Sequence, residues 1–286
     1  MFFQSIYRKE NEDKGDFTVI VISKERPFSL RSFLISLEKY FFDISEVKVL
    51  ICCTDDENKN RYEEIKSNFL NKINVEFIFE TNGFKESFIK ILSSIDNDKI
   101  MLCVDDQVFF RGINYHVVKE AAKKVNFFTL RFGKYSSYSY NLDIEMHQPY
   151  NGLNDRLFYT WRCKSTKDDF NYALSFDATI FDKKLLLYMA RYIIYTSPNQ
   201  LESYMNYCKY LLVFFGFSIG CLRYQMVINF VLNRVQTDNF NKSLGFTVEE
   251  LNNLYDIGKY VAVDKLFIKK FKSSHADFGY IFKDIK

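Results

Sequence analysis

Residues 99–106 read KIMLCVDD, an uninterrupted apolar run that ends on two adjacent carboxylates. A run of this length predicts a strand that is buried on both faces of a sheet. Similar runs occur at residues 18–22 (TVIVI), 47–54 (VKVLICCT) and 75–79 (VEFIF). Apolar residues recur at helical spacing between these runs, which is typical of βαβ units with a parallel sheet. The first half of the chain is therefore predicted to be α/β.

The second half has a less regular pattern. A Tyr-rich stretch at residues 136–161 shows neither helical nor strand spacing. Around it we predict strands at 127–132, 170–181 and within 222–235, and helices at 182–194, 199–212 and 246–258. No Pro-, Gly- or Ser-rich linker separates the halves. We therefore expect one domain over residues 1–286, with halves at about 17–133 and 134–286.

Composition limits the classes of function. The 286 residues carry 39 Lys and Arg against 36 Asp and Glu, a net charge of +3, so nucleic acid is not expected as a partner. The six cysteines lack CxxC spacing, and residues 1–16 do not resemble a secretory signal, so we expect a cytoplasmic protein. The apolar stretch 211–222 is shorter than the roughly 20 residues that span a bilayer. Any association with the inner face of the membrane is expected to be peripheral.

The residues that follow the strands are the candidates for ligand binding. Ligands of parallel sheets bind beyond the carboxyl ends of the strands. These positions are Ser23 to Arg26, Thr54 to Asp56, Thr81 to Lys85 and Asp105 to Gln107. Two adjacent carboxylates at such an edge can hold a hard divalent cation that bridges to a diphosphate, or they can form a solvated turn or a helix cap.

Short motifs follow the predicted strands in a distinctive order. They are Ser23-x-x-Arg26-Pro27, Asp55-Asp56, Asp105-Asp106 and, in the second half, LSFDATIF (174–181), SPNQLE (197–202) and SSH (273–275). In this order they resemble glycosyltransferases of the GT-A fold, above all the broad family-2 type that uses nucleotide-diphosphate sugars. The resemblance implies a Rossmann-like, mixed and mainly parallel sheet flanked by helices. It also implies that the first half binds the nucleotide sugar and the second half faces the acceptor.

The resemblance implies specific contacts with the donor. Ser23 and Arg26 would lie near the nucleotide base or its phosphates. Asp55 would accept a hydrogen bond from a uracil-type ring, with Asp56 as the alternative. Lys85 would sit beside the ribose or the diphosphate.

The Asp105-Asp106 pair matches the acidic (DXD-like) motif of the family, which places carboxylates at its first and third positions. Gln107 takes the third position in one alignment, and Asp106 takes it in the other. We favour Asp106 as the direct ligand of Mn²⁺ or Mg²⁺, with Asp105 contacting the sugar or the ribose. A C-terminal histidine completes the metal site in several GT-A enzymes, and His275 matches it; otherwise it is a surface histidine.

Candidate catalytic residues lie in the second half. A transfer that inverts the anomeric centre needs a base for the acceptor hydroxyl, and Glu202 in the first turn of a predicted helix is our choice. Its alternative role is simple helix N-terminal electrostatics. Asp177 interrupts an apolar run and is expected to contact the acceptor or the donor sugar. Arg131 is expected to contact the diphosphate, and Trp161 either stacks on a sugar or belongs to the core.

The sequence thus predicts a hexosyltransferase that moves a sugar from a nucleotide-diphosphate sugar, with a UDP-sugar preferred, to a glycan, lipid-linked or protein acceptor. One alternative is a GT-A-like protein that binds a glycan or a partner without catalysis. The other is a sugar-1-phosphate nucleotidyltransferase. It needs a Gly-rich phosphate loop, and residues 23–30 contain no glycine.

Overall fold

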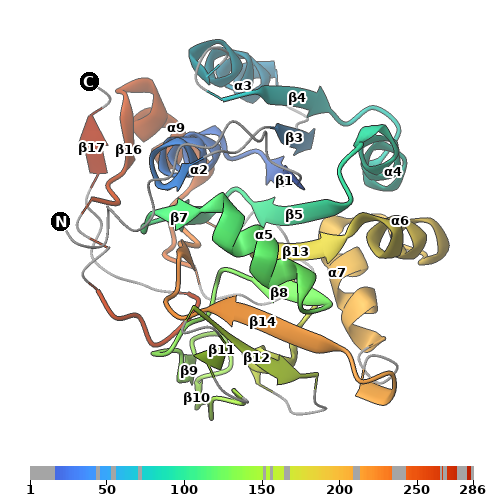
Figure 1. The fold of residues 1–286 in the computed structure, drawn as a ribbon. Coiled ribbons are helices and arrows are strands. Elements are labelled where there is room, and N and C mark those ends of the chain that lie inside the picture. The colour runs from blue at the N-terminus through green and yellow to red at the C-terminus, as the bar shows by residue number, and fades with distance from the viewer. Residues whose placement is uncertain are drawn as a thin grey trace.

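The computed structural model of the chain describes residues 17–42, 46–52, 56–69, 73–150, 153–154, 157–163, 168–208, 213–233, 243–264, 266, 269–275 and 282–284. A nine-stranded sheet forms the centre of this part of the chain (Figure 1). Its strands lie in the order β11 (Leu153–Asn154), β12 (Phe158–Arg162), β14 (Ser218–Leu222), β8 (Phe127–Thr129), β13 (Thr179–Asp182), β5 (Lys99–Val104), β1 (Phe17–Lys24), β3 (Val47–Cys52) and β4 (Val75–Phe79).

The predicted class, α/β with a mixed and mainly parallel sheet, is confirmed. Strands β4, β3, β1 and β5 are parallel neighbours, as their apolar runs predict. In the second half, β13 and β12 each run antiparallel to both of their neighbours, whereas β8 and β14 are parallel. Four short pairs lie outside the main sheet: β6 (Gln107–Phe109) with β15 (Val227–Asn229), β9 (Tyr138–Ser139) with β10 (Ile144–Glu145), β16 (Lys259–Val261) with β17 (Phe282–Asp284), and β2 (Phe41–Phe42) with β7 (Ile113–Asn114).

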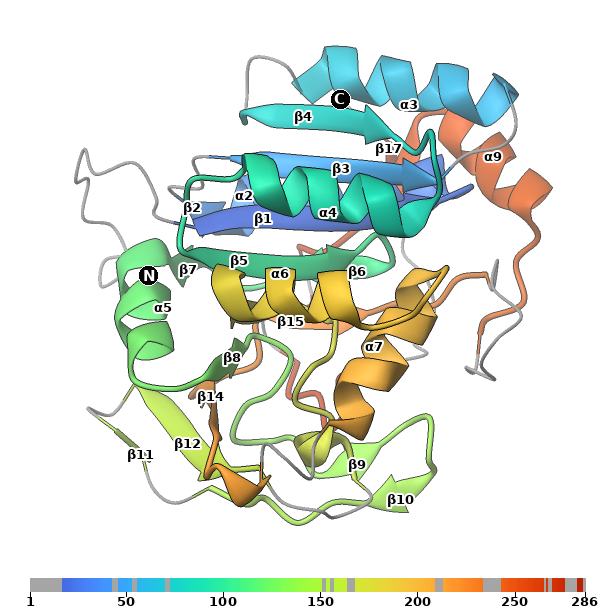
Figure 2. The same cartoon turned by 90° about the vertical axis from the view of Figure 1, so that its right-hand side faces the viewer.

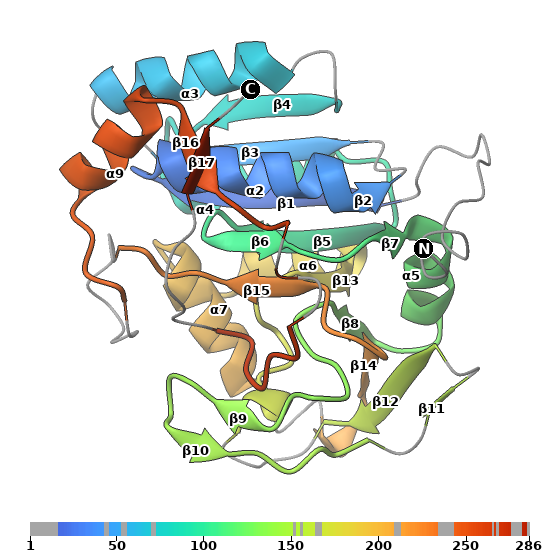
Figure 3. The same cartoon turned by 90° about the vertical axis from the view of Figure 1, so that its left-hand side faces the viewer.

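Helices cover both faces of the sheet (Figures 2 and 3). One face packs on α2 (Pro27–Tyr40), α3 (Asp56–Phe69), α5 (Tyr115–Lys123) and α9 (Val248–Asp256), and the other packs on α4 (Phe84–Ser94), α6 (Lys183–Tyr192) and α7 (Pro198–Tyr207). The side chains of β1 alternate between the two cores, because successive residues of a strand point to opposite faces. Val19 and Val21 enter the first core, and Ile20 and Ile22 enter the second.

The predicted strand at 170–181 is wrong over most of its length. The segment begins as a 3₁₀ turn, η1 (Asp169–Asn171), and becomes extended only in β13. The carbonyl oxygens of Asp169 and Tyr172 accept hydrogen bonds from the Arg131 side chain, at 3.3 and 2.6 Å. The segment therefore satisfies these backbone groups without a partner strand.

Other boundaries in the second half also differ from the predictions. Helix α7 ends at Tyr207, and the strand region expected within 222–235 is divided between β14 and β15.

Trp161 is fully buried and donates to the carbonyl oxygen of Phe170 at 3.0 Å, so it belongs to the core. Within the described part of the chain, none of the helices has the length and apolar character needed to cross a membrane.

Candidate functional site

Arg26 and two carboxylates meet where β1 and β5 end. These strands are parallel neighbours, and the backbone N–H of Asp105 donates to the carbonyl oxygen of Ile22 at 3.2 Å. Arg26 Nη2 lies 2.5 Å from Asp105 Oδ1, and Nη1 lies 3.0 Å from Asp106 Oδ2. The structure thus brings Arg26 to a pair of adjacent carboxylates that lies about 80 positions later in the sequence.

Asp105 is held by a second set of contacts. Ser23 Oγ donates to Asp105 Oδ2 at 2.6 Å and lies 2.8 Å from the hydroxyl of Tyr62. The same Tyr62 hydroxyl accepts from the backbone N–H of Arg26 at 2.9 Å. In sequence Tyr62 appears only as one apolar position of a helix, so no local pattern distinguishes it. Both oxygens of Asp105 therefore have protein partners, and its carboxylate is fixed in place.

Burial and charge set the ionisation of this cluster. Burial raises the pKa of Asp105 to about 6, against the opposing effect of Arg26. Burial alone would lower the pKa of Arg26, but the carboxylates of Asp105 and Asp106 outweigh it and raise the pKa. Above pH 6 one guanidinium therefore faces two carboxylates, with a summed charge of −1. A diphosphate would need an additional cation to bind beside it.

Asp177 lies at the centre of an adjoining polar network and accepts hydrogen bonds from three side chains. Its Oδ1 accepts from Gln107 Nε2 at 3.0 Å and from Asn229 Nδ2 at 2.7 Å, and its Oδ2 accepts from Arg131 Nη1 at 3.1 Å. Burial alone would raise the pKa of Asp177, but Arg131 and then His275 favour the carboxylate, and the net shift is downward. Asp177 is therefore an anion at neutral pH. Asn229 was not among the sequence candidates.

Arg131 uses its donors within the protein. Besides Asp177 and the two carbonyl groups of the η1 segment, Arg131 Nη1 donates to Ser175 Oγ at 2.9 Å. The side chain is almost completely buried. Its predicted contact with the diphosphate stays a prediction. In the structure Arg131 neutralises and orients Asp177.

Glu202 joins this network from α7, where it lies in the second turn and not in the predicted first turn, because the helix begins at Pro198. Ser197 caps the helix by accepting from the backbone N–H of Gln200, and Pro198 opens it. Glu202 Oε1 accepts from the backbone N–H of Phe176 at 2.9 Å, directly beside Asp177. Burial, and then the negative charge of Asp177, raise the pKa of Glu202 to about 7. A carboxyl group with this pKa can take up a proton near neutral pH, as a general base must.

Strand β15 brings His275 to the same edge. The backbone N–H of Phe230 donates to the carbonyl oxygen of Asp106 at 2.7 Å. Asn229 pairs with Gln107 across the β6–β15 ladder and forms a parallel bridge with His275 on its other side. His275 Nε2 lies 3.4 Å from Asn229 Nδ2. Three neighbouring backbones thus carry Asp106, Asn229 and His275.

Asp106 and His275 could supply part of a site for a divalent cation, whose other ligands would come from a substrate and water. Asp106 Oδ1 is buried and has no hydrogen-bond partner among the described residues, so one carboxylate oxygen is free to act as a ligand. Carboxylate oxygen and imidazole nitrogen both suit Mn²⁺. The described residues contain no group of three or more His, Cys, Asp or Glu side chains that could hold a metal. The remaining ligands would be phosphate oxygens and water, as is common for Mg²⁺.

Strained backbone flanks both parts of the site. Glu25, between β1 and Arg26, has φ of 51°, and Ala178, directly after Asp177, has φ of 47°. Side chains other than glycine rarely adopt this left-handed conformation, which costs of order 1–3 kcal/mol and clusters at functional sites. Packing at the ends of β1 and β13 therefore holds Arg26 and Asp177 in fixed directions.

Some predicted residues are not brought to this cluster. Lys85 Nζ donates to the carbonyl oxygen of Ile193 at 2.7 Å and lies 5.2 Å from the centre of the Tyr195 ring. Its predicted contact with ribose or diphosphate stays a prediction. Asp55 lies outside the described residues. Its alternative, Asp56, is the exposed first residue of α3.

Comparisons with known proteins find solved structures of similar fold, but no similar sequence family. No protein-family model matches the chain, and no curated protein does. The structure of S. aureus TarS 1-349 with UDP is 16% identical over 74% of this chain and 59% of that chain, with a TM-score of 0.49. Whole S. aureus TarS is 17% identical over 72% of this chain and 35% of its own, with a TM-score of 0.47. The 4-diphosphocytidyl-2C-methyl-D-erythritol synthase of Anaerococcus prevotii is 12% identical over 67% of this chain and 83% of its own, with a TM-score of 0.39.

Proposed function

We propose that the chain is a glycosyltransferase that moves a sugar from a nucleotide-diphosphate sugar, preferably a UDP-sugar, to an acceptor hydroxyl. One observation carries the proposal. A largely buried Arg26–Asp105–Asp106 cluster at the ends of parallel strands lies beside a network in which Glu202 has its pKa raised to about 7. The first part suits a diphosphate with a cation, and the second part suits a base.

In this reaction the acceptor oxygen forms a bond to the anomeric carbon of the sugar, and the bond from that carbon to the diphosphate breaks. The acceptor proton passes to Glu202, and the electron pair of the broken bond leaves with the diphosphate. Arg26 donates toward the diphosphate from its position between two carboxylates, and Asp177 orients the sugar or the acceptor.

A divalent cation held by Asp106, together with His275, would neutralise charge on the leaving diphosphate. The Asp106 oxygen without a partner supports this assignment, as does the summed charge of −1 in the cluster. Asp105, which is fixed by Ser23 and Arg26, would contact the ribose or the sugar.

Binding of the donor gives the first test. A ligand that binds only the folded chain stabilises it by about 2.7 kcal/mol at a concentration of 100 times its Kd. We expect a UDP-sugar with Mn²⁺ to raise the melting temperature by several degrees, more than GDP-, CMP- or dTDP-sugars do. A nucleoside diphosphate should then be released when an acceptor is added.

Two outcomes of this screen would favour other functions. Binding of a glycan with no shift by any sugar nucleotide would indicate a protein without transferase activity. Release of pyrophosphate from a nucleoside triphosphate and a sugar 1-phosphate would indicate a nucleotidyltransferase, which is less favoured because no glycine follows β1 before α2.

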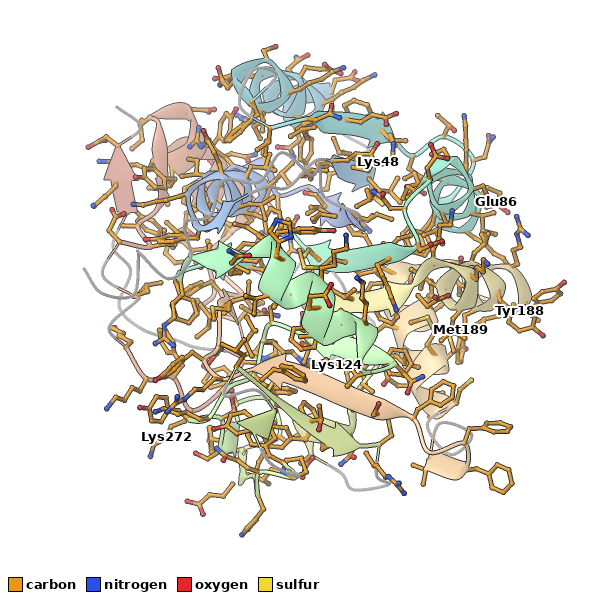
Figure 4. The ribbon with its side chains drawn as sticks, viewed as in Figure 1. Lys48, Glu86, Lys124, Tyr188, Met189 and Lys272 are labelled. Carbon is orange, nitrogen blue, oxygen red and sulfur yellow. The ribbon has the colours of Figure 1, made fainter. Side chains whose placement is uncertain are left out.

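We also propose that the protein associates peripherally with the inner face of the membrane through α6, α7 and residues 213–217. Tyr192 on α6 and Tyr207 on α7 are each 71% exposed, and Phe214 is 82% exposed. These elements share the side of the molecule that faces the viewer in Figure 2, and Figure 4 shows Tyr188 pointing outward from α6. Exposed Tyr and Phe side chains favour the membrane–water interface. The exposed side chains of Lys184 and Arg191 on α6 add positive charge to this face, which suits anionic lipid.

Sedimentation with vesicles tests this surface. We expect Phe214→Ser with Phe215→Ser to reduce binding to vesicles of phosphatidylglycerol and phosphatidylcholine by about tenfold, because two exposed rings lose their contact with lipid. Leu142→Ser with Ile257→Ser removes two exposed apolar side chains elsewhere and should leave binding unchanged. Equal losses in the two variants, or no binding by the original chain, would refute the assignment.

A further inference from the structure

Cations surround two tyrosine rings next to the candidate site. Lys134 Nζ lies 4.8 Å from the centre of the Tyr135 ring and 4.9 Å from that of Tyr224. Lys270 Nζ lies 5.2 Å from the Tyr135 ring, and the Arg223 guanidinium lies 5.6 Å from the Tyr224 ring. We call this surface the cation–tyrosine patch. Its members are Lys134, Tyr135, Arg223, Tyr224, Lys270 and Lys272.

Three distant segments build the patch through backbone contacts. The backbone N–H of Lys134 donates to the carbonyl oxygen of Arg223 at 2.9 Å, and that of Ser137 donates to Lys272 at 2.8 Å. A Cβ on Gly133 would lie 2.4 Å from the backbone nitrogen of Gln225. Glycine is therefore needed at position 133 for this close approach. The arrangement is fixed by the fold and does not depend on flexible side chains alone.

The patch carries positive charge that no described carboxylate balances. Among the described residues, Lys134, Arg223, Lys270 and Lys272 form no salt bridge. Four cations close together repel one another, so such a surface is stabilised when it binds an anion.

The patch continues directly into the candidate site. Lys272 is followed by Ser273, whose carbonyl oxygen accepts from Gln225 Nε2 at 3.1 Å, and then by His275. His275 bridges to Asn229, which binds Asp177. In Figure 3 the segment that carries these residues crosses the front of β15, and Figure 4 shows Lys272 at the edge of the molecule. A chain lying on the patch can therefore reach the site with one end.

We infer that the cation–tyrosine patch binds an anionic polysaccharide, which is the acceptor of the proposed transferase. Binding of the polysaccharide does not depend on the proposed function, whereas its role as the acceptor rests on that function. Ammonium and guanidinium groups pair with phosphate or carboxylate groups along such a chain. Tyrosine rings present flat apolar faces, against which the C–H edges of sugar rings pack, and a hydroxyl at the rim.

A nucleic acid and an anionic bilayer offer the same charge, but they fit the patch less well. The net charge of the chain is only +3, so no wide field supports binding along a nucleic acid. Large exposed apolar side chains gather on α6 and α7 instead, and a bilayer would be expected to use those. Binding of an anionic polysaccharide requires only a local row of cationic side chains with tyrosine rings between them.

Direct binding, measured without any donor, tests the inference. The probes are polygalacturonate as the anionic glycan and dextran as the neutral one. We expect the chain to bind polygalacturonate with an affinity that falls as salt rises, and not to bind dextran. The variant Lys134→Gln, Lys270→Gln, Lys272→Gln should bind about tenfold more weakly, since each exposed pair contributes a fraction of a kcal/mol to about 1 kcal/mol.

A matched variant separates the patch from overall charge. Lys59→Gln, Lys90→Gln, Lys123→Gln removes the same charge from exposed positions on helices α3, α4 and α5 and should bind polygalacturonate as the original chain does. Equal loss in both variants, equal binding of dextran, or tighter binding of polyuridylate or of phosphatidylglycerol vesicles than of polygalacturonate would overturn the inference. The melting shift with UDP-sugar is measured separately. Its absence alongside specific binding of polygalacturonate would contradict the transferase and leave the glycan site in place.

Discussion

Replacing Glu202 by Gln is expected to lower kcat by about 10²–10⁴-fold and to leave binding of the UDP-sugar unchanged, because proton transfer is lost while the side chain keeps its shape. The amide oxygen of Gln can still accept from the backbone N–H of Phe176, as Oε1 does at 2.9 Å. The local backbone beside Asp177 should therefore be preserved. Single-turnover kinetics and the UDP-dependent melting shift measure the two quantities separately.

The pH dependence follows from the raised pKa of Glu202. A base must be deprotonated, so kcat should rise with pH through about 7 and then level off. Stability should change in the opposite sense. Because the folded pKa lies above the ordinary glutamate value of 4.5, the stability that Glu202 contributes is complete below pH 4.5 and is lost as pH rises through about 7. At pH 8 the Glu202→Gln variant should therefore melt at a higher temperature than the original chain.

A surface carboxylate provides the control for this prediction. Glu249→Gln changes an exposed residue in the first turn of α9 and should alter neither kcat nor its pH profile. A Glu202→Gln variant that keeps full activity would remove Glu202 from the reaction. A variant that loses activity and melts at a lower temperature at pH 8 would assign Glu202 a structural role only.

The first half of the fold could be predicted because three of its four strands, β1, β3 and β5, are buried on both faces. Such strands are continuous apolar runs, and the runs at 18–22, 47–54, 75–79 and 99–104 correspond to β1, β3, β4 and β5. In the second half, long-range contacts decide the structure. Arg131 holds the segment around Tyr172 as a loop, and no local pattern reveals that contact.

In the site, too, some residues could be predicted from sequence and others depend on long-range contacts. Position after a strand was enough to select Ser23, Arg26 and the Asp105–Asp106 pair, since the carboxyl ends of parallel strands meet at one edge. The partners that orient these residues come from elsewhere in the chain. Tyr62 appears in sequence as an ordinary core position of a helix, and Asn229 lies 52 positions from the Asp177 that it binds. Their roles are visible only once the chain is folded.

Gln107 stands where one alignment of the acidic motif expects a carboxylate, and the structure explains why an amide occupies this position. In sequence it is either the neutral third position of the acidic motif or a neighbour of it. In the structure it is completely buried, and its amide donates to Asp177 Oδ1 at 3.0 Å. A carboxylate at this position would face the Asp177 carboxylate without a proton between them, which is unfavourable in a buried site. Gln107 thus connects the donor end of the site to Asp177.

Replacing Asp106 by Asn is expected to abolish the effect of Mn²⁺ on UDP binding and to lower kcat by about 10²-fold or more. The buried Oδ1 of Asp106 has no partner among the described residues, and the cluster of Arg26, Asp105 and Asp106 carries a summed charge of −1. Mn²⁺ should therefore increase the UDP-dependent melting shift of the original chain. In Asp106→Asn the shift should be the same with Mn²⁺ as with a chelator, because an amide oxygen is a weaker ligand than a carboxylate.

Asp98→Asn is the matched control, because Asp98 is exposed and lies at the opposite end of β5. It should keep both the Mn²⁺ effect and the activity. His275→Gln should weaken the Mn²⁺ effect in part, since Asp106 remains as a ligand. An undiminished Mn²⁺ effect in Asp106→Asn would exclude Asp106 as the ligand. A chelator that leaves UDP binding and transfer unchanged in the original chain would mean that Arg26 alone balances the diphosphate, in which case Arg26→Gln should lose UDP binding while Asp106→Asn retains it.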